Sequence, residues 1–226
     1  MRFLNDELKQ NEFFTEISEN VRTRTDFFSE ESEEEYSPEE YERKQEEKLI
    51  SSLSEANNMN RCCDIDIKEY FSSIFEFLIS DIRFSYRKLY LCSKNEIFKG
   101  FKDKYLVTNL LILSLINEIE YKNPIKLSAR LENDTLKLKY ELKVEENDAN
   151  LDELKSSNKR IFSKIGYINS LIASELSSFD LKISAKTLTA SLTISESKTQ
   201  NQLSCHASLD SYACDILKEY LERIFY

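Results

Sequence analysis

The side chains that carry most enzyme chemistry are scarce in this chain. Its 226 residues include one histidine, His206, and five cysteines, of which Cys62 and Cys63 are adjacent and none stands in a C-x-x-C spacing. One imidazole cannot supply a multi-histidine zinc site or a His–His relay. An odd set of unpatterned thiols is typical of reduced cysteines in a cytosolic protein. We therefore expect no metal site and no disulfide framework.

Glycine is also scarce. Only Gly100 and Gly166 are present, where average usage of about 7% would give roughly sixteen. Two glycines so far apart cannot form a Rossmann fingerprint, a P-loop or a nucleophile elbow, because each of these motifs needs closely spaced glycines. The usual glycine-dependent phosphate cradles are therefore excluded.

The net charge of −10 is concentrated in one stretch. Between Asp26 and Lys48, eleven acidic residues face three basic ones, which gives −8 and leaves −2 for the rest of the chain. Nothing resembles a basic nucleic-acid footprint, so no nucleic-acid partner is expected. The longest apolar run, Leu110–Ile116, is far short of the ~20 residues that span a membrane, and the N-terminus has no signal-peptide core. We expect a cytoplasmic protein with no membrane contact.

Two helices are predicted at the N-terminal end. The first carries one apolar stripe, made of Leu8, Phe14, Ile17, Val21 and Phe28. The second opens at Ser37-Pro38 with a serine cap, a proline and early acids, and its stripe is Leu49, Leu53 and Ala56. Both stripes are narrow, like the seam of a coiled coil. They predict a helical hairpin with an acidic loop, which forms a four-helix bundle with a second copy.

Helices and one-faced strands follow from residue 64. Asp66 and Glu69 predict a capping box that opens an amphipathic helix, with Ile82 among its inward residues. Strict alternation predicts two β-hairpins. The remaining expected elements are a short strand over Lys88–Cys92, a helix over Asp103–Tyr121, hairpins over 125–144 and 181–194, a helix over 161–176, polar loops over 145–158 and 199–208, and a helix over Leu209–Phe225.

This order of elements predicts an α+β fold. An N-terminal helical hairpin is followed by a two-layer α/β sandwich, in which helices cover one side of a mixed sheet. The expected domains are the dimerising hairpin with its acidic loop over residues 1–62, the sandwich over 63–197, and a linker with the C-terminal helix over 198–226.

The segment Phe13–Thr25 resembles the H-box of bacterial sensor histidine kinases, F-[LI]-A-N-[IM]-S-H-E-[LI]-R-T-P-[LI]. The identical positions are Phe13, Ile17, Ser18, Arg22 and Thr23. The order of elements is also similar to that family, whose core joins a dimerising hairpin to an ATP-binding sandwich of the GHKL class. The resemblance covers about residues 12–195 and implies a homodimer.

The residues at the family's phosphate-handling positions differ. Glu19 stands where the resemblance places the phosphoaccepting histidine, Asn20 where it places the neighbouring acid, and Arg24 where it places the helix-bending proline. A carboxylate does not replace imidazole as phosphoacceptor and donor in this chemistry. The resemblance therefore implies a degenerate phosphoacceptor position at Glu19 and no catalytic residue.

The segment Leu113–Tyr121 resembles the family's N-box, N-L-x-x-N-A-x-K-[YF]. Asn117 falls on the second asparagine, which in the family ligates the Mg²⁺ of the nucleotide, whereas Leu113 and Glu120 replace the first asparagine and the lysine. The glycine boxes are reduced to Gly166. Asn117 and Gly166 are thus the candidate remains of a nucleotide site. The alternatives are a partly buried polar residue for Asn117 and a close-packing position or turn for Gly166.

We expect a histidine-kinase-like regulatory protein that is not an enzyme and uses no cofactor. It would be a pseudo histidine kinase that binds a response regulator, a sensor kinase or another regulator. The partner-binding residues implied by the resemblance are Phe14, Ser18, Glu19 and Arg22. The alternatives are a weak nucleotide-binding kinase or phosphotransfer relative, and an unrelated α/β interaction domain.

Overall fold

The structure is a computed structural model that describes residues 37–59, 61–84, 87–120, 122–144, 151–173, 177–184, 186–195, 203–206 and 209–225. The first predicted helix, with Phe14, Ser18, Glu19 and Arg22, lies outside these residues. The chain divides into two compact units, Met1–Arg43 and Lys44–Tyr226. The hydrophobic core belongs to the second unit.

The described residues form both helices and strands, and all of these elements except the start of α2 lie in the second unit. In chain order the elements are α2 (Pro38–Asn57), β1 (Cys62–Asp66), α3 (Ile67–Ser80), β2 (Leu89–Ser93), β3 (Ile97–Lys102), α4 (Asp103–Ile119), β4 (Ile125–Glu132), β5 (Thr135–Lys143), α5 (Leu151–Ser157), α6 (Lys159–Ile172), β6 (Ser177–Ser184), β7 (Thr187–Ser195), β8 (Leu203–His206) and α7 (Ser211–Ile224).

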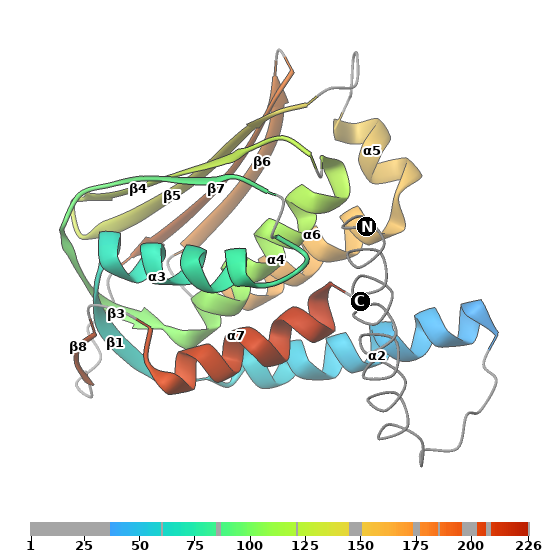
Figure 1. Cartoon of the computed structure of the whole chain (residues 1–226). Coiled ribbons are helices and arrows are strands. Elements are labelled where there is room, and N and C mark those ends of the chain that lie inside the picture. Colours follow the sequence, from blue (N-terminus) through green and yellow to red (C-terminus); the bar gives the residue numbers. More distant parts are fainter. Residues whose placement is uncertain are drawn as a thin grey trace, which may run out of the picture. The chain divides into compact units, whose positions relative to one another are not determined.

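A five-stranded mixed sheet forms one layer, in the order β2-β4-β5-β7-β6. Strands β2 and β4 are parallel, and the other neighbours are antiparallel. Helices α3, α4 and α6 lie on one side of this sheet (Figure 1). A smaller sheet, β3-β1-β8, lies beside it. The predicted α+β fold with a mixed sheet and a helical layer is confirmed.

The first predicted hairpin joins β4 to β5 through a two-residue turn. Asn133 and Asp134 have φ angles of 50° and 58°, which is the left-handed backbone that a type I′ turn requires and that Asn and Asp tolerate. The alternating residues of both strands then fall on opposite faces. Leu136, Leu138 and Tyr140 are buried, and Lys137 and Lys139 are exposed.

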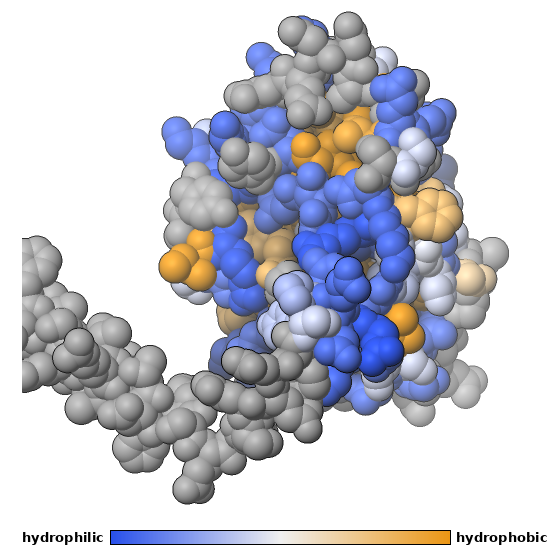
Figure 2. Space-filling view, turned by 90° about the vertical axis from the view of Figure 1, so that its right-hand side faces the viewer, coloured by the Kyte–Doolittle hydropathy of each residue, from blue (hydrophilic) through white to orange (hydrophobic). Residues whose placement is uncertain are grey.

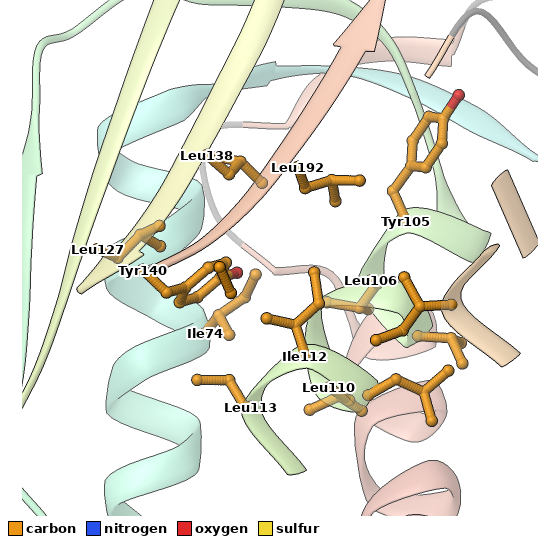
Figure 3. Close-up of a cluster of buried hydrophobic side chains, with 14 of the residues drawn as sticks. Ile74, Tyr105, Leu106, Leu110, Ile112, Leu113, Leu127, Leu138, Tyr140 and Leu192 are labelled. Atoms are coloured by element: carbon orange, nitrogen blue, oxygen red, sulfur yellow. The ribbon is translucent and has the colours of Figure 1, made fainter. Parts of the chain in front are cut away.

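Helix α4 is the centre of the core. Every residue from Asp103 to Ile116 is buried, which explains why this helix is apolar on all sides. Figure 3 shows Leu138 and Leu192 pointing from the sheet into a cluster with Ile74 of α3 and Leu113 of α4. The hydroxyl of Tyr140 donates a hydrogen bond to Oδ1 of Asn109, so these two buried polar groups are paired.

Three predictions about local structure are wrong, and one small sheet was missed. The polar stretch 145–158 contains helix α5, and the predicted linker 199–208 contains strand β8, which pairs in parallel with β1. The small sheet formed by β1, β3 and β8 was not predicted at all. Ile82 is not inward: α3 ends at Ser80, and Ile82 is 82% exposed.

The apolar stripe of α2 is buried by the chain itself. Leu49, Leu53 and Ala56 are 3%, 8% and 0% exposed and belong to the core of the second unit. Helix α7 adds polar contacts, because the hydroxyl of Tyr220 donates to the backbone carbonyl of Ser52 at 2.7 Å. This stripe was predicted to form a seam with a second copy, but it needs no second copy for its burial.

The side of the second unit that carries α5 is mostly hydrophilic, with a few separate hydrophobic patches (Figure 2). Among the helices of the described residues, none combines the length and the apolar character that a membrane span requires.

Candidate functional site

The interface between α4 and α6 holds a buried charged side chain. Lys164 of α6 reaches across to α4, where Nζ donates hydrogen bonds to Oγ of Ser114 and to Oε1 of Glu118, the latter at 2.9 Å. Its side chain is 9% exposed. Ser114 in turn donates to the backbone carbonyl of Ile224 in α7 at 3.4 Å. The ammonium group is thus paired with a carboxylate inside the helical layer, as a buried charge requires.

Burial lowers the pKa of Lys164, and the hydrogen bond and charge of Glu118 oppose that shift. Lys164 was not among the predicted site residues. A signal was present, because Lys164 lies three residues after Ile161 and four before Ile168, both of which are inward. A lysine at an inward position of a helix is rarely buried unless it is paired.

Asn117 lies on the same face of α4 as Ser114, one turn further along the helix. Its Oδ1 atom is buried and has no hydrogen-bond partner among the described residues. A buried acceptor without a partner is uncommon and marks a position where a water, an ion or a ligand group could bind. Asn117 is therefore the one predicted nucleotide-site residue whose environment fits a ligand.

Gly166 does not fit a phosphate cradle. It lies inside α6 on the exposed side, and a Cβ atom placed there would meet nothing within 4 Å. Neither a close approach of backbone to a ligand nor close packing therefore requires glycine at this position. The structure places Asn117 and Gly166 on two helices that pack together, but only Asn117 faces the interface. No catalytic step through a nucleotide or its metal follows from these two residues.

Leu113 and Glu120, at the other two N-box positions, are buried and contact only groups of this chain in the described residues. Leu113 is 1% exposed and packs in the core cluster near Ile74 and Tyr140 (Figure 3). Glu120 is also buried, and its carboxylate accepts a hydrogen bond from the backbone N–H of Lys122 at 2.8 Å.

A second charged cluster joins the beginnings of α4 and α7. Arg61 forms ion pairs with Asp103, at 3.8 Å, and with Asp210, the residue that caps α7. Its guanidinium also lies 4.5 Å from the centre of the Tyr212 ring. Burial raises the pKa of Asp103 to about 6, with the charge of Asp210 adding to the effect and that of Arg61 opposing it. These contacts attach α7 to the sandwich.

The thiol of Cys63 lies beside this cluster and donates to the backbone carbonyl of Phe101. Burial raises its pKa to about 12, so at neutral pH this cysteine is a protonated, unreactive thiol. In the described segments, no group of three or more His, Cys, Asp and Glu side chains is placed to hold a metal ion.

Comparisons with known proteins identify the fold. No family model matches the chain, and no curated protein matches its sequence. Among solved structures, the chain is similar to the histidine kinase AdeS of Acinetobacter baumannii, with 12% identity over 67% of this chain and 77% of that one, at a TM-score of 0.50.

Two further matches are weaker. A histidine kinase of Burkholderia phymatum has 12% identity over 66% of this chain and 78% of its own, at a TM-score of 0.45. Histidine kinase ThkA, in a complex with the response regulator protein TrrA, has 11% identity over 88% of this chain and 66% of its own, at a TM-score of 0.49.

These comparisons correct the prediction that the chain is not an enzyme. AdeS is a histidine kinase, and the described residues are similar to it in fold. The prediction rested on missing residues in short motifs, whereas the likeness to AdeS concerns the fold of the described residues as a whole. The likeness to AdeS, at 12% identity, establishes the fold. Because a fold does not by itself determine function, the kinase activity of this chain has to be measured directly.

Proposed function

We propose that this chain is a cytoplasmic, histidine-kinase-like regulatory protein that acts by binding a partner of a two-component circuit. The partner is a response regulator, a sensor kinase or another regulator of the same circuit. The observation that supports this proposal is the combination of two features in one chain. A segment that resembles the H-box, Phe13–Thr25, precedes a sandwich with the fold of AdeS.

The partner surface we propose is the H-box face. Phe14, Ser18 and Arg22 recur every four residues and therefore share one face of a helix, with Glu19 beside them. Aromatic and arginine side chains are the residue types that most often dominate the binding energy of an interface. We also propose that this helix pairs with a second copy through its apolar stripe, because the stripe of α2 is already buried within the chain.

The experiment compares two arginines in the same helix. Arg22→Glu reverses a charge on the proposed face, and Arg24→Glu makes the same change two residues along, on another face. Each purified full-length variant is titrated with purified receiver domains and kinase dimerisation domains. We expect Arg22→Glu to weaken binding by about tenfold or more and Arg24→Glu to leave it nearly unchanged. Equal affinities for the two variants would contradict the assignment of this face.

Nucleotide binding is a second candidate, and one specific observation favours it. Oδ1 of Asn117 is a buried acceptor with no partner in the described part of a kinase-like fold. Asn117 would be the residue that holds the metal ion of a bound nucleotide, and that ion would neutralise phosphate charge.

Calorimetry with Mg-ATP tests this second candidate. Saturable binding at about 1 mM or tighter, lost in Asn117→Ala and kept in Asn169→Ala, would support it. Asn169 is the matched control because it is an exposed asparagine on α6. Absence of saturable Mg-ATP binding, or equal binding by Asn117→Ala and Asn169→Ala, would contradict nucleotide binding at Asn117.

A further inference from the structure

The outer face of the five-stranded sheet, on the side away from α3, α4 and α6, carries an excess of positive charge. We define this outer sheet face by the side chains of β4 to β7 that alternate with the buried ones. Its basic residues are Lys126, Arg130, Lys137, Lys139, Lys143 and Lys182, and all are exposed. Its acidic residues are Glu132, Glu141 and Asp180. Six basic residues against three acidic ones contrast with 31 against 41 in the whole chain.

Each acidic residue of this face is already engaged by a lysine. Lys137 pairs with Glu132 at 2.5 Å, Lys139 with Glu141 at 2.7 Å, and Lys182 with Asp180 at 2.6 Å. Lys126 and Arg130 have no carboxylate within ion-pair distance in the described parts of the chain. The excess charge is therefore not neutralised within the sheet.

The register of the strands concentrates positive charge around Arg130, whereas Lys126 stands opposite Glu141, which Lys139 engages. Arg130 of β4 stands directly opposite Lys137 of β5, and like charges at directly opposed positions destabilise a sheet. Beyond β5, the outward residues of β7 are all hydroxyl-bearing: Thr187, Thr189, Ser191, Thr193 and Ser195. These hydroxyl groups can donate hydrogen bonds to carboxylates, and the neighbouring lysine and arginine side chains can form ion pairs with them. The face therefore has the chemistry to bind an acidic polypeptide.

The same chain contains a stretch of opposite charge. Asp26–Glu42 has nine acidic residues and no basic one. Three of the nine, Glu39, Glu40 and Glu42, lie in the described part and are exposed. The core unit begins at Lys44, within helix α2, which lies next to α7 on the helical side of the sheet (Figure 1).

We propose that the outer sheet face binds the acidic stretch Asp26–Glu42 of a second copy of this chain. Two copies can exchange their acidic stretches reciprocally, which gives a closed pair with two identical contacts. Because the contact depends on exposed charges, it weakens as salt screens them. The proposal does not rest on the proposed function: the hairpin seam is apolar and does not weaken in this way.

A charge-exchange experiment with full-length chains tests the proposal. Variant one carries Lys126→Glu with Arg130→Glu. In variant two, lysine replaces five glutamates of the stretch: Glu30, Glu31, Glu33, Glu34 and Glu35. Within either variant alone, the stretch and the sheet face have charges of the same sign. In a mixture, each stretch meets a face of the opposite sign. The readout is the weight-average mass from sedimentation, between about 0.05 M and about 0.5 M salt.

We expect the self-association of the wild type to weaken by about tenfold or more between low and high salt. Each variant alone should associate at low salt as weakly as the wild type does at high salt. The mixture of the two variants should associate at low salt as strongly as the wild type does. The matched control, Lys68→Glu with Lys218→Glu, changes two exposed lysines of α3 and α7 by the same charge and should behave as wild type. Self-association that is insensitive to salt, or a mixture that does not recover, would overturn the proposal. So would binding of a single-stranded oligonucleotide to the face without self-association.

Discussion

The hydroxyl of Tyr220 donates a hydrogen bond to the backbone carbonyl of Ser52, at 2.7 Å and across 168 positions of sequence. Arg223, one turn further along α7, donates to Oγ of the same serine. These contacts join the C-terminal helix to α2, whose stripe was expected to bind a second copy. The C-terminal helix is therefore part of the core and not an appended segment.

Replacement of Tyr220 by phenylalanine should destabilise the protein. The ring remains buried, but the carbonyl of Ser52 loses its donor from α7, so we expect a loss of about 1–2 kcal/mol in the free energy of unfolding. Urea denaturation measures this loss. Tyr212→Phe is the matched control, since Tyr212 is 46% exposed. Equal stability of Tyr220→Phe and wild type would contradict the importance of this contact.

Leu53→Ala should reduce stability independently of protein concentration. Leu53 is 8% exposed and packs in the core of its own chain, so truncation should lower the free energy of unfolding by about 2–5 kcal/mol. If a second copy buried it, the loss would depend on concentration. Denaturation at about 1 µM and about 100 µM protein separates the two cases. Ile50→Ala, at an exposed position of the same helix, should change stability far less.

Asp103 should make the protein less stable as pH rises from about 4 to about 6. Its folded pKa is raised to about 6 from 3.8, so over this range the folded state holds a proton that the unfolded state has released. Stability contributed by that proton is present at low pH and is lost as pH rises through the folded pKa. Asp103→Asn imitates the protonated form.

The stability of Asp103→Asn relative to wild type should therefore increase between pH 4 and pH 7, by up to about 3 kcal/mol at 1.36 kcal/mol per pKa unit. Thermal or urea denaturation across this range measures the difference. Asp215→Asn, at an exposed aspartate of α7, is the control. A difference between Asp103→Asn and wild type that is constant with pH would show that the carboxyl titrates normally.

Gly166→Ala should stabilise the protein. The glycine lies inside α6, and an added Cβ meets nothing within 4 Å, so alanine should raise the free energy of unfolding by about 1 kcal/mol through helix propensity. Denaturation measures the gain, and exposed Asn169→Ala on the same helix should give a smaller one. A loss of stability would mean that glycine is needed here for a reason the packing does not show.

The sequence predicted most of the sandwich because its signals are local. Ser37 caps α2 as expected, and its hydrogen bonds with Glu40 are reciprocal. Asp66 accepts from the N–H of Glu69 at the start of α3, where a capping box was expected. Strict alternation predicted the hairpins, because one face of each strand must be buried. Each of these signals comes from residues close together in the sequence, so it can be recognised without knowing which distant residues are in contact.

The small sheet could not be predicted in this way. Strands β1 and β8 are five and four residues long, too short for a periodic pattern, and their pairing depends on residues far apart in sequence. Gly100 in β3 has a φ of 72° and donates its N–H to Asp64. Its left-handed backbone becomes meaningful only once β1 is placed beside it.

The candidate site was predicted in part. Asn117 was identified from its motif, and the structure gives it an unpartnered acceptor. Lys164 was missed because its partners Ser114 and Glu118 lie on another helix, some fifty residues earlier. Gly166 was given a role through the resemblance to the family's glycine boxes, and its surroundings do not require glycine.

The most direct test of the proposed function is calorimetric titration of the full-length chain with every receiver domain and every kinase dimerisation domain encoded in its own genome. We predict saturable binding of at least one of these domains, weakened by Arg22→Glu and kept by Arg24→Glu. If none of the complete set binds, or if the two variants bind equally well, the proposal that this kinase-like protein acts through a two-component partner at its H-box face is contradicted.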